Sequence, residues 1–443
     1  MDIRHPDRRF VLGSLTALTI AFRASGAAAQ SSATPLRIDA ARLRKSLEEL
    51  SVFGRPAGGS FEDGVSRYAY SDADIAGRAY VMSLIRAAGA TPRVDAAGNI
   101  RARREGSVAG LKPIMVGSHI DSVPNGGNFD GALGSLAAVE ILRTLNERQV
   151  LLRHPLEVAL WSNEEGGTIG SEAVAGQLPS ASLDLVMNGI SRRDGIRRIG
   201  GDPDNLDQAR IAPGSLAAYV ELHIEQSDHL EQAGVKIGVV DGIVAIDEYE
   251  VEITGVPNHA GTTPMADRRN ALLAAARLIE AVQEEVTRLP GRQVGTVGHI
   301  EVSPNVRNIV PGRVECSIEL RDLDPAKIQS IGEAIRARAQ TIAAATGTQI
   351  AITKVEGDAP ALASPAIQRQ IEQAAADLGL STMHLPSGAG HDAAPLSVLA
   401  PMGMIFVPSI AGVSHSPRER TTWEDCANGA NVLLGTVLKL DEA

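Results

Sequence analysis

The sequence predicts an α/β protein with a mostly parallel central sheet and an inserted α+β module. Strand-like apolar runs alternate with helical runs through the first half of the chain, which is the pattern of a parallel sheet covered by helices. From about Ala245 the order changes to strand, helix, strand, strand, helix, strand, which is typical of a ferredoxin-like module. At 443 residues the chain is longer than one hydrophobic core usually organises, so two domains are expected.

The elements of the first domain are predicted from continuous apolar runs and from helical periodicity. A strand, a helix and two further strands are expected at 113–120, 131–147, 156–162 and 218–224. The segment Gly200-Gly201-Asp202-Pro203 indicates an irregular surface excursion before the last of these strands.

The inserted module is predicted from strand runs at 249–254, 294–303, 313–321 and 349–355, with helices at 270–287 and 328–345. The α/β pattern then returns with a strand at 400–408 and a terminal helix at 424–440. We therefore assign residues 35–244 and 357–443 to one domain and residues 245–356, called the insert below, to the other.

Composition and charge indicate which classes of molecule this protein is expected to bind. Hydrophobic residues make up 44% and charged residues 21% of the chain, the balance of a globular protein. The formal net charge of −11 disfavours nucleic acid and stable membrane association, because no basic surface would neutralise phosphates. A small-molecule substrate is expected instead.

The N-terminal residues 1–29 resemble a twin-arginine signal peptide. Arg8 and Arg9 precede an apolar run at 12–22 that is too short to span a bilayer, and small residues end at Ala29. The sequence thus predicts an exported, periplasmic protein cleaved near Ala29. Cys316 and Cys426 belong to different predicted elements, so we expect no disulfide between them.

The first cluster of candidate functional residues lies at and after the end of the strand predicted at 113–120. His119 is placed to offer an imidazole nitrogen, and Asp121 lies two residues on, on the same face, where it could orient that imidazole. Asp130 follows in a glycine-rich loop and is a candidate bridging carboxylate. His119 alone would be a structural histidine, but the three together favour a metal site.

The second cluster is the adjacent pair Glu164-Glu165 at the end of the strand predicted at 156–162. Neighbouring carboxylates repel each other and need cations or solvent. Since they point in different directions, one can bind a metal while the other acts as a general base. An exposed acidic turn is the alternative.

Two further histidines complete a ligand set. His223, with Glu225 two residues on, repeats the first pattern at the end of the 218–224 strand, and His415 follows the strand predicted at 400–408. Carboxyl ends of strands meet at one edge of an open α/β sheet, where ligands bind. Three histidines and two carboxylates, one of them shared, suit two cations such as zinc or manganese, with cobalt or nickel also fitting.

These clusters resemble the hydantoinase/carbamoylase family of amidases from about Leu43 to the C-terminus. The motifs GSHIDSV, FDG, NEEGG, ELHIEQ, HAGTTPM, SGAGHDA and GVSH occur in the order found in that family. The resemblance implies a metallopeptidase-like catalytic domain with two metals. It implies that His119 and His223 hold one metal, Glu165 and His415 hold the other, Asp130 bridges them, and Glu164 is the general base.

The same resemblance implies a lid and dimerisation role for the insert, and therefore a homodimer. Within the insert, His259 would polarise the substrate carbonyl, from its own or the partner subunit, and Asn308 and Arg321 would bind the substrate carboxylate. Gln226 and His391 match further substrate-contacting positions. The alternatives are a loop role for His259, an ion pair of Arg321 with Asp322 or Asp324, and a structural turn at His391.

The expected activity is hydrolysis of a C–N bond in a ureido acid such as an N-carbamoyl-L-amino acid, ureidopropionate or allantoate. A dimetal peptidase on the same fold and a noncatalytic protein that binds ureido compounds are the competing hypotheses. The sequence departs from the family in the short segment Gly166-Gly167-Thr168, where an Arg-Phe pair is usual, and at Ser227, where glycine is usual. The first departure affects substrate preference rather than the metal ligands.

Overall fold

A nine-stranded mixed sheet forms the centre of the larger part of the molecule in the computed structural model, which describes residues 35–443. The strands lie in the order β1-β2-β4-β3-β7-β18-β8-β16, with β17 beside β8. The four central strands β4, β3, β7 and β18 run parallel to one another, whereas β2 and β8 flank them antiparallel. The strands are β1 (Arg93–Val94), β2 (Ile100–Arg104), β3 (Ile114–His119), β4 (Leu156–Trp161), β7 (Ala218–Ile224), β8 (Ile237–Ile243), β16 (Ala361–Leu362), β17 (Thr382–Ser387) and β18 (Met402–Val407).

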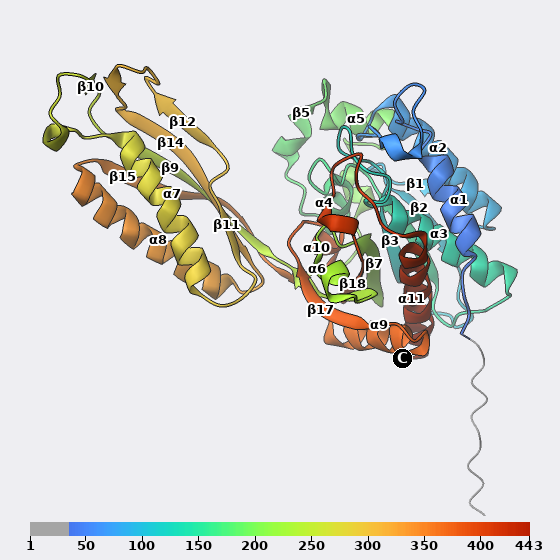
Figure 1. Cartoon of the computed structure of the whole chain (residues 1–443). Helices are drawn as coiled ribbons and strands as arrows, with labels where there is room; N and C mark the ends of the chain where they lie inside the picture. The colour runs from blue at the N-terminus through green and yellow to red at the C-terminus, as the bar shows by residue number, and fades with distance from the viewer. Residues whose placement is uncertain (1–34) are drawn as a thin grey trace, which may run out of the picture. The chain divides into compact units, whose positions relative to one another are not determined.

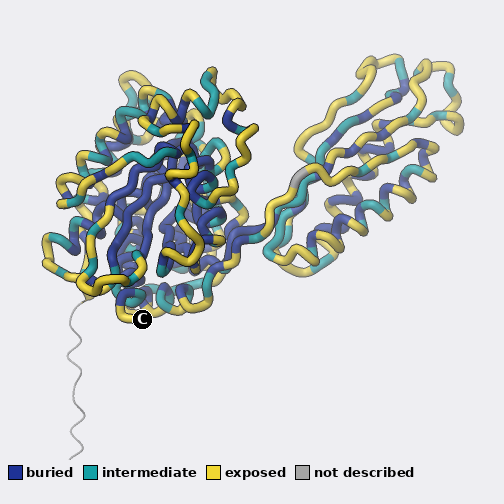
Figure 2. The backbone as a smooth tube through the Cα atoms, turned by 180° about the vertical axis from the view of Figure 1, so that it is seen from behind, coloured by how far each residue is buried: buried dark blue, intermediate teal, exposed yellow. Residues whose placement is uncertain are grey.

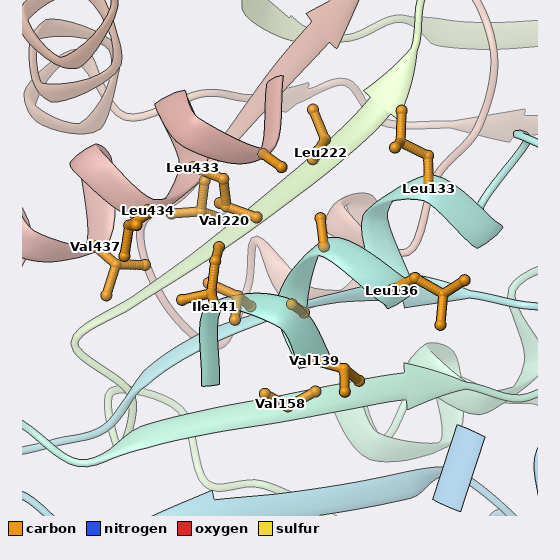
Figure 3. Close-up of a cluster of buried hydrophobic side chains, with 14 of the residues drawn as sticks. Leu133, Leu136, Val139, Ile141, Val158, Val220, Leu222, Leu433, Leu434 and Val437 are labelled. Atoms are coloured by element: carbon orange, nitrogen blue, oxygen red, sulfur yellow. The ribbon is translucent and has the colours of Figure 1, made fainter. Parts of the chain in front are cut away.

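Every residue of β3, β4, β7 and β18 is buried, as parallel strands covered on both faces require (Figure 2). On one face, Val220 of β7 belongs to a core with side chains of α3 and α11, among them Ile141 and Leu433 (Figure 3). On the other face, Tyr219 packs in a second core with residues of shorter helices. The helices are α1 (Ala40–Leu50), α2 (Asp72–Ala87), α3 (Ala132–Glu147), α9 (Pro365–Asp377) and α11 (Trp423–Glu442), and the shorter α4 (Ile169–Ala175), α5 (Arg192–Arg198), α6 (His229–Ala233) and α10 (Ala393–Leu396).

The insert forms a separate antiparallel sheet with its own core. Strands β11, β14, β9 and β15 lie in that order, and β12 pairs with β14 (Figure 1). The two helices α7 and α8 pack against the sheet around Tyr249, Leu278 and Ile331. The elements are β9 (Ala245–Thr254), α7 (Ala271–Arg288), β11 (Val294–Thr296), β12 (Ile300–Ser303), β14 (Arg313–Asp322), α8 (Pro325–Thr346) and β15 (Gln349–Asp358). Two short antiparallel pairs stand outside both sheets: the hairpin of β5 (Val186–Met187) with β6 (Ile190–Ser191), and the pair of β10 (Asn258–His259) with β13 (Ile309–Val310), whose strands are far apart in the chain.

The predicted fold class and the element order of the insert are confirmed, with one local difference. The strand predicted at 294–303 is divided into β11 and β12, which both pair with β14. Residues 297–299 stand opposite only 317–318, so one extra residue interrupts the ladder as a bulge. The two cysteines are free and buried in different cores.

The localisation prediction is corrected. The signal predicted at residues 1–29 lies outside the described residues. Among residues 35–443, no helix has both the length and the apolar character needed to cross a bilayer. No apolar span in the described part of the chain supports export, and the prediction of a periplasmic location is wrong.

Candidate active site

The side chains predicted to bind metal gather at the carboxyl edge of the four parallel strands. His119 is the last residue of β3, and His223 is the last but one of β7. Two residues separate the end of β4 from the pair Glu164-Glu165. His415 lies in the segment between β18 and α11, and Asp130 in the loop between β3 and α3. Sheet order therefore brings together residues that are up to about three hundred positions apart in the chain.

These residues form two groups that share Asp130. One oxygen of Asp130, Oδ1, lies 3.4 Å from Nε2 of His119 and 3.1 Å from Nε2 of His223. The other, Oδ2, lies 3.5 Å from Nε2 of His415, which is itself 3.4 Å from Oε2 of Glu165. In each group the three ligand atoms lie within 4.8 Å of one another, so each group could hold one ion.

Local hydrogen bonds aim the two buried imidazoles at Asp130. Nδ1 of His119 lies 3.1 Å from the carbonyl of Asp121, and Nδ1 of His223 lies 2.9 Å from the carbonyl of Ile224. A carbonyl only accepts, so each ring carries its proton on Nδ1 when neutral. Each Nε2 then presents a lone pair, which is the state in which histidine binds a metal.

Asp121 orients His119 through its backbone and not through its carboxylate. Its side-chain oxygen is 3.8 Å from Nδ1 of His119, and the carboxylate instead accepts the backbone N–H groups of Glu164 at 3.3 Å and Glu165 at 3.1 Å. The carboxylate thus ties the turn after β4 to the end of β3. Glu225 likewise does not contact His223, since it accepts N–H groups at the start of α6.

Glu164 and Glu165 occupy different positions, as their proposed division of labour requires. Glu164 is 9% exposed, and its Oε2 lies 3.6 Å from Nε2 of His119. Burial raises the pKa of Glu164 well above its usual value, against the opposing effect of His119. Burial also raises the pKa of Glu165 to about 8, with Asp130 adding to the effect.

The donor set fits two divalent cations. Three imidazole nitrogens and two carboxylates match the ligand chemistry of zinc and manganese. Burial would raise the pKa of Asp130 too, but His223 and His119 hold it well below its usual value. The carboxylates of this cluster therefore depend on nearby positive charge, and two bound cations would supply it.

A cavity of about 310 Å³ opens onto this cluster and is lined by three of the predicted substrate-binding residues. Arg321, Gln226 and His391 line it together with the ligands Asp130, Glu165, His223 and His415. Arg321 donates to Glu319 at 2.7 Å and to the carbonyl of Gly388 at 2.7 Å, and not to the adjacent Asp322 or to Asp324.

Gln226 and His391 are held against the ligands. Nε2 of Gln226 donates to Oδ2 of Asp130 at 2.7 Å. The ring of His391 lies 4.4 Å from the ring of His223, edge to face, and its Nε2 is 2.9 Å from Oγ of Ser387. Burial lowers the pKa of His391 well below its usual value, so this ring is neutral.

His259 and Asn308 lie together at the β10–β13 strand pair of the insert, exposed, and are not among the residues that line the cavity. Nδ1 of His259 accepts the N–H groups of Gly261 at 3.0 Å and Thr262 at 3.2 Å. The proton of the neutral ring is therefore on Nε2, which leaves an outward N–H donor. Arg321 therefore lines the same cavity as the candidate metal ligands, whereas these two residues do not.

Four non-glycine residues of the site have left-handed backbone. They are Asn163 with φ 54°, Thr168 with φ 53°, Gln226 with φ 60° and His415 with φ 51°. This conformation costs a residue other than glycine about 1–2 kcal/mol, and asparagine less than most. Asn163 and Gln226 each lie two residues beyond the end of a parallel strand, β4 and β7 respectively, whereas His415 lies eight residues beyond β18.

Three buried carboxylates near the site were not found by sequence reasoning. Glu221 accepts from Ser118, Tyr219 and the N–H of Ala393, and Asp392 accepts from Ser171. Glu419 accepts from the loop that carries Asp130. Glu221 could have been noticed as an acid within an apolar strand, whereas Glu419 stands between two arginines and looks exposed in the sequence.

Glycine at position 131 is needed for His119 to approach the α3 helix. A Cβ there would lie 2.3 Å from the His119 ring, and φ is +61°. Gly131→Ala is expected to lower the free energy of unfolding by about 2–4 kcal/mol and to displace a ligand. Thermal unfolding and bound-metal content measure both effects.

Gly110→Ala is the matched control, because Gly110 has φ +84° but open space around the position of a Cβ. Equal losses of stability and of bound metal in the two variants would contradict the close-packing argument.

The chain is similar in sequence and in structure to known proteins. The model of peptidase family M20/M25/M40 matches residues 115–439. An N-carbamoyl-L-amino acid amidohydrolase of Geobacillus stearothermophilus is 43% identical over 91% of this chain and 99% of its own length. A ureidoglycolate hydrolase of Arabidopsis thaliana is 36% identical over 92% and 88%, respectively. The crystal structure of a hydantoinase/carbamoylase family amidase from Burkholderia multivorans is 37% identical, covers 91% of this chain and 98% of that one, and has a TM-score of 0.83.

Proposed function

Because this chain belongs to the hydantoinase/carbamoylase amidases of peptidase family M20/M25/M40, we propose that it hydrolyses the C–N bond of a ureido acid with two divalent cations. The observation that carries the proposal is that Asp130 is common to two groups of metal-binding side chains. We propose an N-carbamoyl-L-amino acid as the substrate, with ureidopropionate and allantoate in the same chemical class. The products would be ammonia, carbon dioxide and the free amino acid.

The proposed roles follow from where each group lies. His119, Asp130 and His223 would hold one cation, and Asp130, Glu165 and His415 the other. Bound there, the cations would supply Lewis acidity and lower the pKa of a water. Glu164, beside His119 but outside both groups, accepts a proton from the attacking water and delivers it to the leaving nitrogen.

Substrate recognition is proposed to come from the cavity and from the insert. Arg321 can bind a carboxylate through its planar fork, and it lines the cavity while it donates to the carbonyl of Gly388. Gln226 and His391 line the same space beside the ligands. We propose that Asn308 joins Arg321 on the substrate carboxylate and that the N–H at Nε2 of His259 stabilises the oxyanion.

His259 has to be brought to the reacting carbonyl by movement of its own insert, acting as a lid, or by the insert of a partner in a homodimer. Mixing two inactive proteins, Glu164→Gln and His259→Ala, separates these routes. In a mixed dimer, only donation from the partner creates one site with both wild-type residues, so recovery of activity on mixing assigns His259 to the partner subunit. Persistent inactivity of dimers shown to be mixed assigns it to the same chain.

A substrate panel tests the proposed function. Protein loaded with Zn²⁺ or Mn²⁺ is assayed against N-carbamoyl-L-amino acids, ureidopropionate, allantoate and dipeptides, with ammonia and free amino acid measured separately. We expect ammonia release from at least one ureido acid and no dipeptide cleavage. Dipeptide cleavage without ammonia would indicate a peptidase, and binding of a ureido acid without ammonia would indicate a noncatalytic binding protein.

A further inference from the structure

Glu419 is a fully buried carboxylate with no basic partner among residues 35–443. It is 0% exposed, and the neighbouring Arg420 is directed to Glu62 and to backbone carbonyls. An uncompensated carboxylate is costly to bury unless hydrogen bonds replace its hydration. Among the described residues, every group that donates a hydrogen bond to Glu419 lies at the candidate metal-binding cluster.

The contacts of Glu419 converge on the shared ligand. Its Oε1 accepts the backbone N–H of Phe129 at 2.9 Å and of Asp130 at 3.1 Å. Its Oε2 lies 3.0 Å from Oγ of Ser414, and the same Oγ lies 3.0 Å from Oδ2 of Asp130. Glu419 therefore reaches Asp130 twice, through its backbone and, by way of Ser414, through its carboxylate.

The fit around Glu419 is close on the side of the glycine-rich loop. A Cβ at Gly127 would lie 2.0 Å from Oε1 of Glu419. This contact explains why the loop before Asp130 approaches as backbone alone. The carboxylate thus joins two segments, residues 127–130 after β3 and residues 414–419 after β18, which carry the shared ligand and His415.

We propose that Glu419 is a positioning residue of the cation pair, which fixes Asp130 and the His415 segment in the arrangement that binds both ions. It would contact neither ion itself, because it belongs to neither group of candidate ligands and its two oxygens accept from the backbone of Phe129 and Asp130 and from Ser414. Its action on the ions passes through Asp130. This inference rests on the proposed dimetal site, and it assigns a role to a residue that the proposed reaction does not use.

Hydrogen-bond geometry predicts which replacement keeps this role. In Glu419→Gln, the amide oxygen can accept both backbone N–H groups, and the amide nitrogen can donate to Ser414. The hydroxyl proton of Ser414 is then free for Asp130. Glu419→Ala removes all three hydrogen bonds and leaves the two N–H groups unpaired.

The test measures binding of Mn²⁺ alone to metal-free protein by calorimetry, without substrate. We expect Glu419→Ala to bind Mn²⁺ about 10–100-fold more weakly than wild type, and Ser414→Ala to fall toward the lower end of that range. Glu419→Gln should bind close to wild type. Glu140→Ala is the matched control, because Glu140 is also buried but pairs with Arg42 at 2.6 Å, outside the two segments that Glu419 joins; it should lower thermal stability and leave Mn²⁺ affinity unchanged.

Wild-type affinity in Glu419→Ala, or an affinity in Glu419→Gln as low as in Glu419→Ala, would overturn the positioning role. If Glu419→Ala does not fold, Ser414→Ala decides, and unchanged Mn²⁺ affinity in that variant overturns the role as well. Failure of wild type to bind Mn²⁺ would instead refute the dimetal site on which the proposed function depends, so the two failures are distinguishable.

Discussion

Replacement of Asp130 by asparagine is expected to weaken binding of both cations by more than about 100-fold and to leave no measurable turnover. Its two oxygens contact His119 and His223 on one side and His415 on the other. An amide offers one oxygen and no charge, so neither group of ligands stays complete. Metal content after dialysis, together with the rise in melting temperature on adding Zn²⁺, measures the loss.

The control for this variant is Asp377→Asn. Asp377 is a surface carboxylate that pairs with Lys439 at 2.7 Å, so its replacement should leave metal content and activity unchanged. Retention of two metal equivalents per chain by Asp130→Asn would mean that Asp130 is not a shared ligand, and the proposed reaction would lose its foundation.

Glu164→Gln is expected to keep both cations and to lower kcat by about 10²–10⁴-fold, the usual contribution of a general base. Glu164 is close in shape to glutamine and lies outside both ligand groups, so the amide should fit the same buried space. Steady-state kinetics with the metal-loaded protein, and metal content determined on the same sample, are the measurements.

The neighbouring residue provides the contrast. Glu165→Gln makes the same chemical change one position away, but in a ligand of the second group, and should release one cation while also losing activity. If the two variants lost metal equally, the assignment of one carboxylate as ligand and the other as base would be wrong. A Glu164→Gln protein with near wild-type kcat would remove Glu164 from the proton transfer.

The four parallel strands of the larger sheet and the grouping of the candidate ligands could be predicted because the apolar runs that mark buried strands are local signals. The ends of β3, β4, β7 and β18 fall within two residues of their predicted positions. Once four strands are recognised as parallel, their carboxyl ends have to meet. This is why His119 and His415 could be placed together despite their separation in the sequence.

The remaining features depend on tertiary contacts that have no local signature. Asp121 was expected to bind His119 through its side chain, but whether a carboxylate turns to an imidazole or to the N–H groups of the next strand depends on packing. Glu419 was missed because burial of an acid between two arginines arises only when two loops meet. The exposed His259 of the β10–β13 strand pair was assigned to the site by resemblance alone.

Gln226 and His415 have left-handed backbone, so a substitution that stabilises the fold at either position is expected to lower activity. Glycine at either position would relieve about 1–2 kcal/mol of conformational energy. The greater freedom of glycine in the unfolded chain offsets about 0.4–1 kcal/mol of this, so a smaller gain in thermal stability is expected. The same exchange would delete a proposed cation ligand at 415 and the amide that donates to Asp130 at 226. Screening variants for thermal tolerance alone should therefore enrich inactive proteins at these two turns.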